Sequence, residues 1–271
     1  MPGTISSPRR ISAVIFDWAG TLIDFGSLAP VLALQGLFEL HNVPLTNEEV
    51  RAPMGLLKRD HIRELLAMPR IRAAWTQTHG TPDEQTVDSL NTELEQRMPE
   101  LAAKRAEPLP GVVEILHRLR ARDIRIGSTT GYTRTTMNMV QPAARDAGIV
   151  VEALLTPSEV PAGRPYPWMM FANFQALNVY PPECVVKVGD TLQDIAEGRN
   201  AGAWTVGVLV GSSQLGLSAE EFTQLDENTR EQRIEEARAA FTRAGAHYVM
   251  RSMDELDTVI DAIEHRLTER H

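Results

Sequence analysis

The stretch that decides the fold is ISAVIFDWAGT, residues 11–21. Its first part, residues 11–16, is almost wholly apolar, and Asp17 follows it directly. An apolar run of this length is typical of a β-strand that is buried on both faces. Gly20 and Thr21 allow a tight turn after the acid. The pattern therefore puts a carboxylate at the carboxyl end of a buried strand; the alternative is that Asp17 only caps the turn.

Similar patterns recur along the chain. Further strands are predicted at residues 124–129, 153–156, 184–188 and 204–210. Helical patterns follow some of them, at residues 112–122, 168–177 and 194–201, and later at 218–244 and 253–266. This alternation predicts a Rossmann-like α/β fold, with a parallel sheet covered by helices on both faces. In such sheets, ligands bind beyond the carboxyl ends of the strands.

One interval, residues 28–104, contains no convincing strand. Helices are predicted there at residues 31–41, 47–51, 57–67, 71–78 and 82–103. A helical insertion of this size after the first strand predicts a separate cap domain. We expect a core of residues 1–25 and 105–271 and a cap of residues 26–104, with hinges near residues 25–26 and 105–110.

Composition excludes several classes of protein. A chain of 271 residues, 43% of them hydrophobic, can bury a substantial core. Its formal charge of −9 does not attract nucleic acid. Cys184 is the only cysteine, so it forms no internal disulfide and is predicted to pack in the core. Residues 1–10 lack a signal-peptide core, and no stretch approaches the roughly 20 apolar residues of a membrane span. We expect a cytoplasmic protein that binds neither nucleic acid nor membrane.

A second acidic cluster ends the strand predicted at residues 184–188. Asp190 and Asp194 lie four residues apart at the start of a helix. Carboxylates brought together repel each other unless a proton or cation lies between them. Oxygen ligands of this kind suit Mg²⁺, which often bridges a phosphate. The alternative is that either acid is an ordinary helix N-cap.

Two clusters fit an anionic substrate. The segment STTGY, residues 128–132, follows the second strand, and hydroxyls and N–H groups at a helix start bind phosphate oxygens. The segment GRPYP, residues 163–167, supplies Arg164 as a cation. Arg164 would otherwise be a solvated loop residue.

In this order on successive strands, the clusters resemble the haloacid dehalogenase (HAD) superfamily. The resemblance implies that Asp17 is the nucleophile and that Thr130 and Arg164 hold the phosphoryl group. It also implies that Asp190 and Asp194 complete a Mg²⁺ site, and that the helical insertion is the cap of this family.

Position 19 departs from the phosphatases of this superfamily. They carry Asp-x-Asp, in which the second acid protonates the leaving alcohol, whereas this chain has Ala19. General acid catalysis is often worth roughly 10²–10⁴-fold. The leaving group of this enzyme is therefore expected to be one that needs no such acid.

The predicted cap offers a replacement chemistry in RAPMGLLKRDH, residues 51–61. A loop with Pro53 and Gly55 leads into a helix on which Lys58 and His61 share a face. A desolvated lysine has a lowered pKa and can attack a carbonyl group as the free amine. An isolated lysine is usually a surface residue, but Ala19 favours the catalytic interpretation.

With these residues the chain resembles the phosphonoacetaldehyde hydrolase family within the superfamily. The similarity runs over about residues 11–263 and is carried by residues 16–21, 53–58, 127–134, 161–168 and 187–191. It implies hydrolysis of the carbon–phosphorus bond of phosphonoacetaldehyde to acetaldehyde and phosphate, in 2-aminoethylphosphonate degradation. Lys58 would form a Schiff base with the aldehyde, and Asp17 would become an aspartyl-phosphate.

The resemblance also implies the remaining parts of the site. Mg²⁺ would be held by Asp17, the backbone carbonyl of Ala19 and Asp190, with support from Asp194. The other site residues that it implies are Met54, Gly55, His61 and Tyr132.

The roles of these last residues are open. Met54, Gly55 and His61 would lie near Lys58, where Met54 and His61 could order its proton transfers. Tyr132 would shape the pocket or simply pack. Members of the family are homodimers that pair through the cap. The apolar residues 28–40 could supply that surface or be internal to the cap.

Two rival functions are weighed against this one. A two-carbon or sugar phosphatase or mutase of the same superfamily would want an acid at position 19. A non-catalytic phosphate-binding or regulatory protein would not need the intact set of Asp17, Asp190 and Asp194.

Overall fold

The computed structural model describes residues 10–269; residues 1–9 and 270–271 of the predicted core lie outside this range. Within it, one parallel sheet has the strand order β3-β2-β1-β4-β5-β6. The strands are β1 (Ala13–Phe16), β2 (Arg125–Thr129), β3 (Ala153–Leu155), β4 (Val185–Gly189), β5 (Trp204–Val208) and β6 (Tyr248–Met250). The chain runs outward from β1 to β3 and returns to place β4 on the other side of β1. The reversal opens a crevice beyond the carboxyl ends of β1 and β4.

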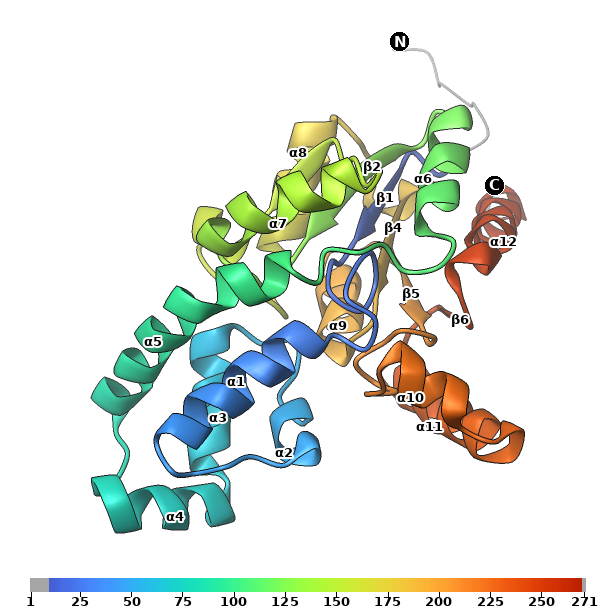
Figure 1. Cartoon of the computed structure of the whole chain (residues 1–271). Coiled ribbons are helices and arrows are strands. Elements are labelled where there is room, and N and C mark those ends of the chain that lie inside the picture. Colours follow the sequence, from blue (N-terminus) through green and yellow to red (C-terminus); the bar gives the residue numbers. More distant parts are fainter. Residues whose placement is uncertain (1–9, 270–271) are drawn as a thin grey trace.

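Helices cover both faces of the sheet (Figure 1). Those of the core are α6 (Val112–Ala121), α7 (Arg134–Asp146), α8 (Trp168–Leu177), α9 (Leu192–Asn200), α10 (Ala219–Gln224), α11 (Glu227–Arg243) and α12 (Leu256–Glu269). Single 3₁₀ turns lie at Pro157–Glu159, Pro182–Cys184 and Met253–Glu255. Successive residues of a strand face opposite sides. Accordingly Val14 and Phe16 pack in the cluster that contains α6 and α12, whereas Ala13 and Ile15 pack against α8.

The structure adds two elements to the prediction. Strand β6 and helix α7 were not expected, and the charged segment 218–244 contains two helices rather than one uninterrupted pattern. The break has a local cause, because Leu225 has an extended backbone conformation and Asp226 caps α11 by accepting a hydrogen bond from the N–H of Thr229. Cys184 is buried, as predicted.

The interval between β1 and α6 is helical, as predicted. It contains α1 (Leu28–Leu40), α2 (Asn47–Arg51), α3 (Lys58–Ala67), α4 (Pro69–His79) and α5 (Glu84–Ala103), which lie beyond the carboxyl edge of the sheet (Figure 1). Leu34, Leu37 and Phe38 of α1 are fully buried, whereas Leu32 and Leu40 are 43% and 57% exposed. Most of the apolar face of α1 is therefore internal.

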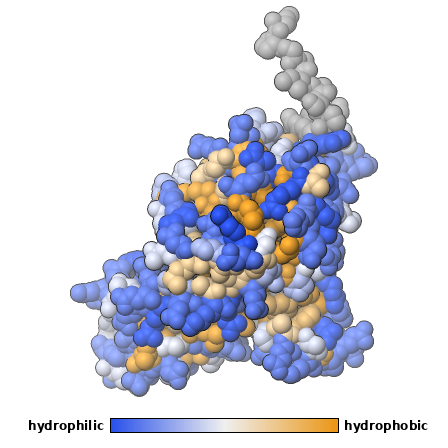
Figure 2. All heavy atoms as spheres, turned by 45° about the horizontal axis from the view of Figure 1, so that its top comes forward, coloured by the Kyte–Doolittle hydropathy of each residue, from blue (hydrophilic) through white to orange (hydrophobic). Residues whose placement is uncertain are grey.

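The surface is mainly polar. Figure 2 shows hydrophilic residues over much of one face, with hydrophobic residues gathered in separate patches between them. Among the residues described, no helix has both the length and the apolar character needed to cross a bilayer.

Candidate active site

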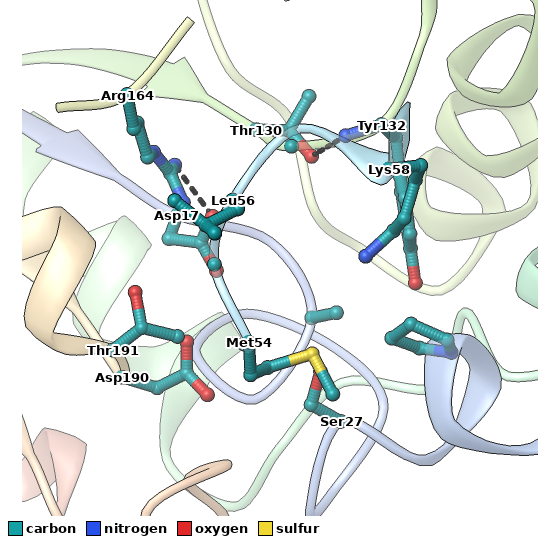
Figure 3. A pocket seen from close by; sticks show the side chains of 14 residues that line it. Asp17, Ser27, Met54, Leu56, Lys58, Thr130, Tyr132, Arg164, Asp190 and Thr191 are labelled. Carbon is teal, nitrogen blue, oxygen red and sulfur yellow. Dashed lines mark hydrogen bonds and ion pairs between the residues drawn. The ribbon is translucent and has the colours of Figure 1, made fainter. Parts of the chain in front are cut away.

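A small pocket lies where the loop before α3 meets the carboxyl ends of the core strands (Figure 3). Its free volume is about 30 Å³, room for little more than a water molecule. The residues that line it are Asp17, Ala19, Ser27, Pro30, Met54, Gly55, Leu56, Lys58, Thr130, Gly131, Tyr132, Arg164, Asp190 and Thr191. Residues from both predicted domains thus enclose one space.

Asp17 is held at the end of β1. Its N–H donates to the carbonyl of Val188 on β4 at 2.9 Å, and its Oδ1 accepts a hydrogen bond from Arg164 Nη2 at 2.6 Å. Asp17 as a whole is only 4% exposed. Burial and the charge of Asp194 raise the pKa of this carboxyl group, and Arg164 opposes them. Asp17 is a desolvated carboxylate with one fixed cationic partner, which suits a nucleophile.

Asp190 lies directly opposite, at the end of β4. Its Oδ2 accepts a hydrogen bond from the N–H of Ser213 at 2.7 Å, while its Oδ1 is buried and has no hydrogen-bond partner in the described chain. A Cβ at Gly20 would lie 2.2 Å from Oδ2, so only glycine lets the first turn approach this closely. Burial, followed by the charges of Asp17 and Asp194, raises the pKa of Asp190 well above its usual range.

Asp194 has a different environment. Thr191 is the N-cap of α9, and Asp194 Oδ2 accepts from its hydroxyl at 2.6 Å and from its N–H at 3.1 Å. The alternative in which Asp190 or Asp194 is the N-cap is therefore wrong. Burial acts to raise the pKa of Asp194, but Arg164 and Lys187 together hold it below its ordinary value. Asp194 does not line the pocket.

The acidic cluster fits a divalent cation. One carboxylate oxygen from each of Asp17, Asp190 and Asp194 lies within 4.8 Å of the others. Unpaired buried oxygens repel each other unless a cation compensates them, and Asp190 Oδ1 is such an atom. Hard oxygen donors in a small buried site suit Mg²⁺. Ala19 lines the same pocket.

Arg164 and Thr130 complete the polar side of the pocket. The Arg164 residue is 6% exposed, and its Nη1 lies 3.0 Å from Asp194 Oδ1, so it is not a solvated loop residue. Thr130 Oγ1 accepts a hydrogen bond from the N–H of Tyr132 at 3.1 Å. Both side chains border the space beside Asp17 (Figure 3).

Lys58 comes from the other side of the pocket, as the first residue of α3. Its amino group points into the space that Asp17 borders (Figure 3). Burial lowers the pKa of Lys58 to about 8, and the charge of Asp17 opposes this shift. At neutral pH about a tenth of this lysine is therefore the free amine, far more than for an ordinary exposed lysine.

The supporting residues divide into two groups. Met54, Gly55 and Tyr132 line the pocket, and the Tyr132 hydroxyl is buried with no hydrogen-bond partner among the described residues. Burial raises the pKa of Tyr132. His61 does not line the pocket: its Nε2 lies 2.8 Å from the carbonyl of Val50, and burial lowers its pKa to about 3. A neutral imidazole thus lies behind Lys58.

Sequence reasoning assigned no individual role to three buried residues beside Arg164, namely Thr129, Lys187 and Glu197, although the first two lie in the segments 128–132 and 187–191 singled out above. A signal for Lys187 was present, because a charged residue interrupts an otherwise apolar strand. Glu197 lies three residues after Asp194, on the same face of α9.

Comparisons with known proteins agree with this geometry. Residues 11–202 match the family model of haloacid dehalogenase-like hydrolases. The phosphonoacetaldehyde hydrolase of Bacillus cytotoxicus is 48% identical over 94% of this chain and 97% of its own length. That of Bacillus cereus strain ATCC 10987 is 47% identical over the same shares.

A solved structure agrees over the whole fold. The crystal structure of a phosphonoacetaldehyde hydrolase-like protein from Oleispira antarctica has a TM-score of 0.96 and 34% identity, covering 100% of this chain and 99% of that one. The chain therefore belongs to the haloacid dehalogenase-like hydrolases and, within them, to the phosphonoacetaldehyde hydrolase family.

Proposed function

We propose that this hydrolase cleaves the carbon–phosphorus bond of phosphonoacetaldehyde, giving acetaldehyde and phosphate, in the degradation of 2-aminoethylphosphonate. The observation that carries the proposal is that Lys58 and Asp17 line one small pocket from opposite sides. One offers an amine for an aldehyde, and the other offers a carboxylate for phosphorus. The names of the curated relatives support the same substrate.

The first half of the proposed reaction belongs to Lys58. Its free amine attacks the aldehyde carbon, and loss of water with uptake of one proton from solvent leaves a protonated imine. The lowered pKa favours this attack, because only the unprotonated amine is a nucleophile. The imine is an electron sink two bonds from phosphorus, so the carbon leaving group becomes an enamine instead of an unstabilised carbanion.

The second half belongs to Asp17. One of its oxygens attacks phosphorus in line, and the carbon–phosphorus electron pair moves into the imine. Arg164 stays against Asp17 and balances negative charge. The enamine then takes a proton on carbon and is hydrolysed, which frees acetaldehyde and Lys58. A second water hydrolyses the aspartyl-phosphate and restores Asp17.

The residues that would hold Mg²⁺ are Asp17, Asp190 and the backbone carbonyl of Ala19, with Asp194 in support. When bound, the cation would neutralise charge on the phosphonate and on the attacking carboxylate. The chain itself keeps the acids together at one side of a small pocket.

Residue 19 separates this proposal from a phosphatase. Ala19 lines the pocket at the position where a phosphatase of the superfamily carries its general acid. A carbon leaving group that departs as an enamine needs no proton from that position. The same side chain would leave an alkoxide unprotonated, and a phosphate ester would be a poor substrate.

Closure of residues 26–104 over the core is part of the proposal, because Lys58 and Asp17 come from different sides of the pocket. We also propose a cytoplasmic homodimer that pairs through this cap. The exposed Leu32 and Leu40 on α1 are consistent with such a surface. Sedimentation of the purified chain, and of a variant with both leucines replaced by serine, tests the dimer.

Borohydride trapping tests the chemistry. The sequence has only three lysines, Lys58, Lys104 and Lys187, so the modified position can be assigned without ambiguity by peptide mass spectrometry. Phosphonoacetaldehyde, Mg²⁺ and borohydride should put a reduced adduct on Lys58 and abolish phosphate release. Lys104 is the matched control, because its side chain is 67% exposed and lies outside the pocket.

The variants decide between the proposal and its rival. Lys58→Ala should lose the adduct and the activity, and Lys104→Ala should keep both. Phosphate release by Lys58→Ala, without an adduct in the parent protein, would return the chain to the general phosphatase function.

A further inference from the structure

Behind the pocket lies a buried network of Thr129, Lys187 and Glu197, which the reaction above does not use. All three residues are 0% exposed, and none lines the pocket. Lysine and glutamate are almost never fully buried unless they are paired. Their presence beneath the reacting edge therefore calls for a specific role.

The Thr129 hydroxyl is the centre of the network. It accepts hydrogen bonds from Lys187 Nζ at 2.8 Å and from Arg164 Nη2 at 2.9 Å, and it donates to Glu197 Oε2 at 2.9 Å. A hydroxyl has one proton and two lone pairs, so its bonding capacity is fully used. Because the proton points to Glu197, the two lone pairs are left to face Lys187 and Arg164.

The network surrounds the guanidinium group of Arg164. Its Nε donates to Glu197 Oε2 at 3.1 Å, and its Nη1 lies 3.0 Å from Asp194 Oδ1. Its Nη2 is shared between Thr129 and Asp17. All three nitrogens of the Arg164 guanidinium group thus contact acceptors, which are Glu197, Asp194, Thr129 and Asp17. Of these four, only Asp17 is a reacting group.

Lys187 balances the charge of this arrangement. Its Nζ lies 3.0 Å from Asp194 Oδ1 and 3.4 Å from Glu197 Oε2. Without this ammonium group, Arg164 alone would face Glu197 and Asp194 as well as Asp17. With it, two buried cations face those two buried acids, and more of the positive charge of Arg164 remains for Asp17 and for a phosphoryl group.

The backbone makes room for the buried lysine. A Cβ at Gly198 of α9 would lie 2.6 Å from Thr205 Cγ2 on β5, 2.8 Å from Lys187 Cβ and 3.0 Å from Lys187 Cγ. Glycine at this position lets α9 approach β4 closely enough for Glu197 to reach both cations. The local fold is therefore adapted to the network by a feature separate from its hydrogen bonds.

We propose that Thr129, Lys187 and Glu197 are positioning residues that fix the guanidinium group of Arg164 against Asp17. This inference rests on the proposed function for the role of Arg164. The rival explanation is that the network only stabilises the core. Buried ion pairs are often no more stabilising than well-packed apolar side chains, so stability alone explains them poorly.

The first test is Thr129→Val, which keeps the shape of the side chain and removes the hydroxyl. The matched control is Thr205→Val on β5, because Thr205 is also fully buried and its hydroxyl lies 2.8 Å from His247 Nδ1. Valine keeps the methyl group that packs beside Gly198, so the control removes a buried hydroxyl without removing a hydrogen bond of the network. Both variants should lower the melting temperature. Only Thr129→Val should lower kcat/KM, by roughly 10- to 100-fold, mostly through kcat, because a misplaced catalytic group costs about that much.

Binding of inorganic phosphate with Mg²⁺ gives a readout that does not depend on turnover. Its dissociation constant should rise in Thr129→Val and stay at the parent value in Thr205→Val, while the Lys58 adduct forms in both. Phosphate binding and kcat in Thr129→Val within twofold of the control would overturn the inference. Failure of the parent protein to form the adduct would instead overturn the proposed function. The comparison of phosphate binding would still test whether the network positions Arg164.

A charge-balanced double variant, Glu197→Leu with Lys187→Met, separates positioning from electrostatics. It removes one charge of each sign, so it adds no uncompensated charge and should remain folded. Its kcat should still fall at least about tenfold, because Arg164 Nε has lost its acceptor. A folded double variant with the kcat of the parent protein would show that the network does not position Arg164.

Discussion

Gly55 controls how closely the loop before α3 approaches the core. Its φ is +93°, a conformation that residues with a Cβ rarely adopt. A Cβ there would lie 2.7 Å from Thr191 Oγ1 and 3.0 Å from Gln193 Cβ and Cγ, and these residues lie at the start of α9. Gly55→Ala should therefore oppose the closed arrangement that brings Lys58 to Asp17.

The magnitude follows from two costs. A residue with a Cβ pays about 1–2 kcal/mol in the left-handed region. Crowding by an added methyl group in a packed contact costs about 1–3 kcal/mol. If opening of the cap relieves both, the closed state loses about 2 kcal/mol or more, and kcat/KM should fall at least about 30-fold.

The assay compares Gly55→Ala with Gly80→Ala. Gly80 ends α4 with φ +84°, but a Cβ there would meet nothing within 4 Å. The control thus carries backbone strain without a contact between cap and core. Both variants should have a lower melting temperature. Only Gly55→Ala should show the fall in kcat/KM for phosphate release and slower trapping of Lys58. Equal kcat/KM values in the two variants would refute the idea that this contact governs closure.

Three further predictions concern other parts of the molecule. Because burial lowers the pKa of Lys58 to about 8 and only the free amine attacks, kcat/KM should rise with pH up to about 8 and then level off; a flat profile below that pH would contradict this. Asp190→Asn removes a carboxylate that faces the proposed cation, so calorimetry should show Mg²⁺ binding weakened at least about tenfold, and unchanged affinity would exclude Asp190 as a ligand. Phe38→Ala removes a fully buried ring and should lower the free energy of unfolding by about 3–5 kcal/mol in denaturant melts, with kcat retained under folding conditions.

Much of the fold was predictable, because buried parallel strands are marked by continuous apolar runs. The run before Asp17 is β1, and the runs before Thr130 and Gly189 correspond to β2 and β4. Strand β6 was not predicted because it has only three residues at the edge of the sheet, and Tyr248 and Val249 are only partly buried. Such a strand is stabilised more by pairing with its neighbour, β5, than by the β-propensity of its own residues.

The site was predictable to the extent that its residues follow strand ends. Asp17, Thr130 and Asp190 occupy such positions, and the structure brings them to one pocket. The network around Arg164 was not predictable in the same way. Thr129 and Glu197 are 68 residues apart, and their contact depends on how α9 packs against the sheet.

The buried charges at the strand ends also constrain the order of binding. Asp17, Asp190, Asp194 and Glu197 face Arg164, Lys187 and Lys58. With all of these groups ionised, the formal charges sum to −1 before any ligand enters. A phosphonate dianion that entered this interior first would meet repulsion from an already negative site. Substrate should therefore enter as the second partner of the divalent cation, or together with it. The product phosphate should likewise bind weakly when the cation is scarce. The concentration of the cation should therefore set how much of the site is occupied by phosphonate or by phosphate.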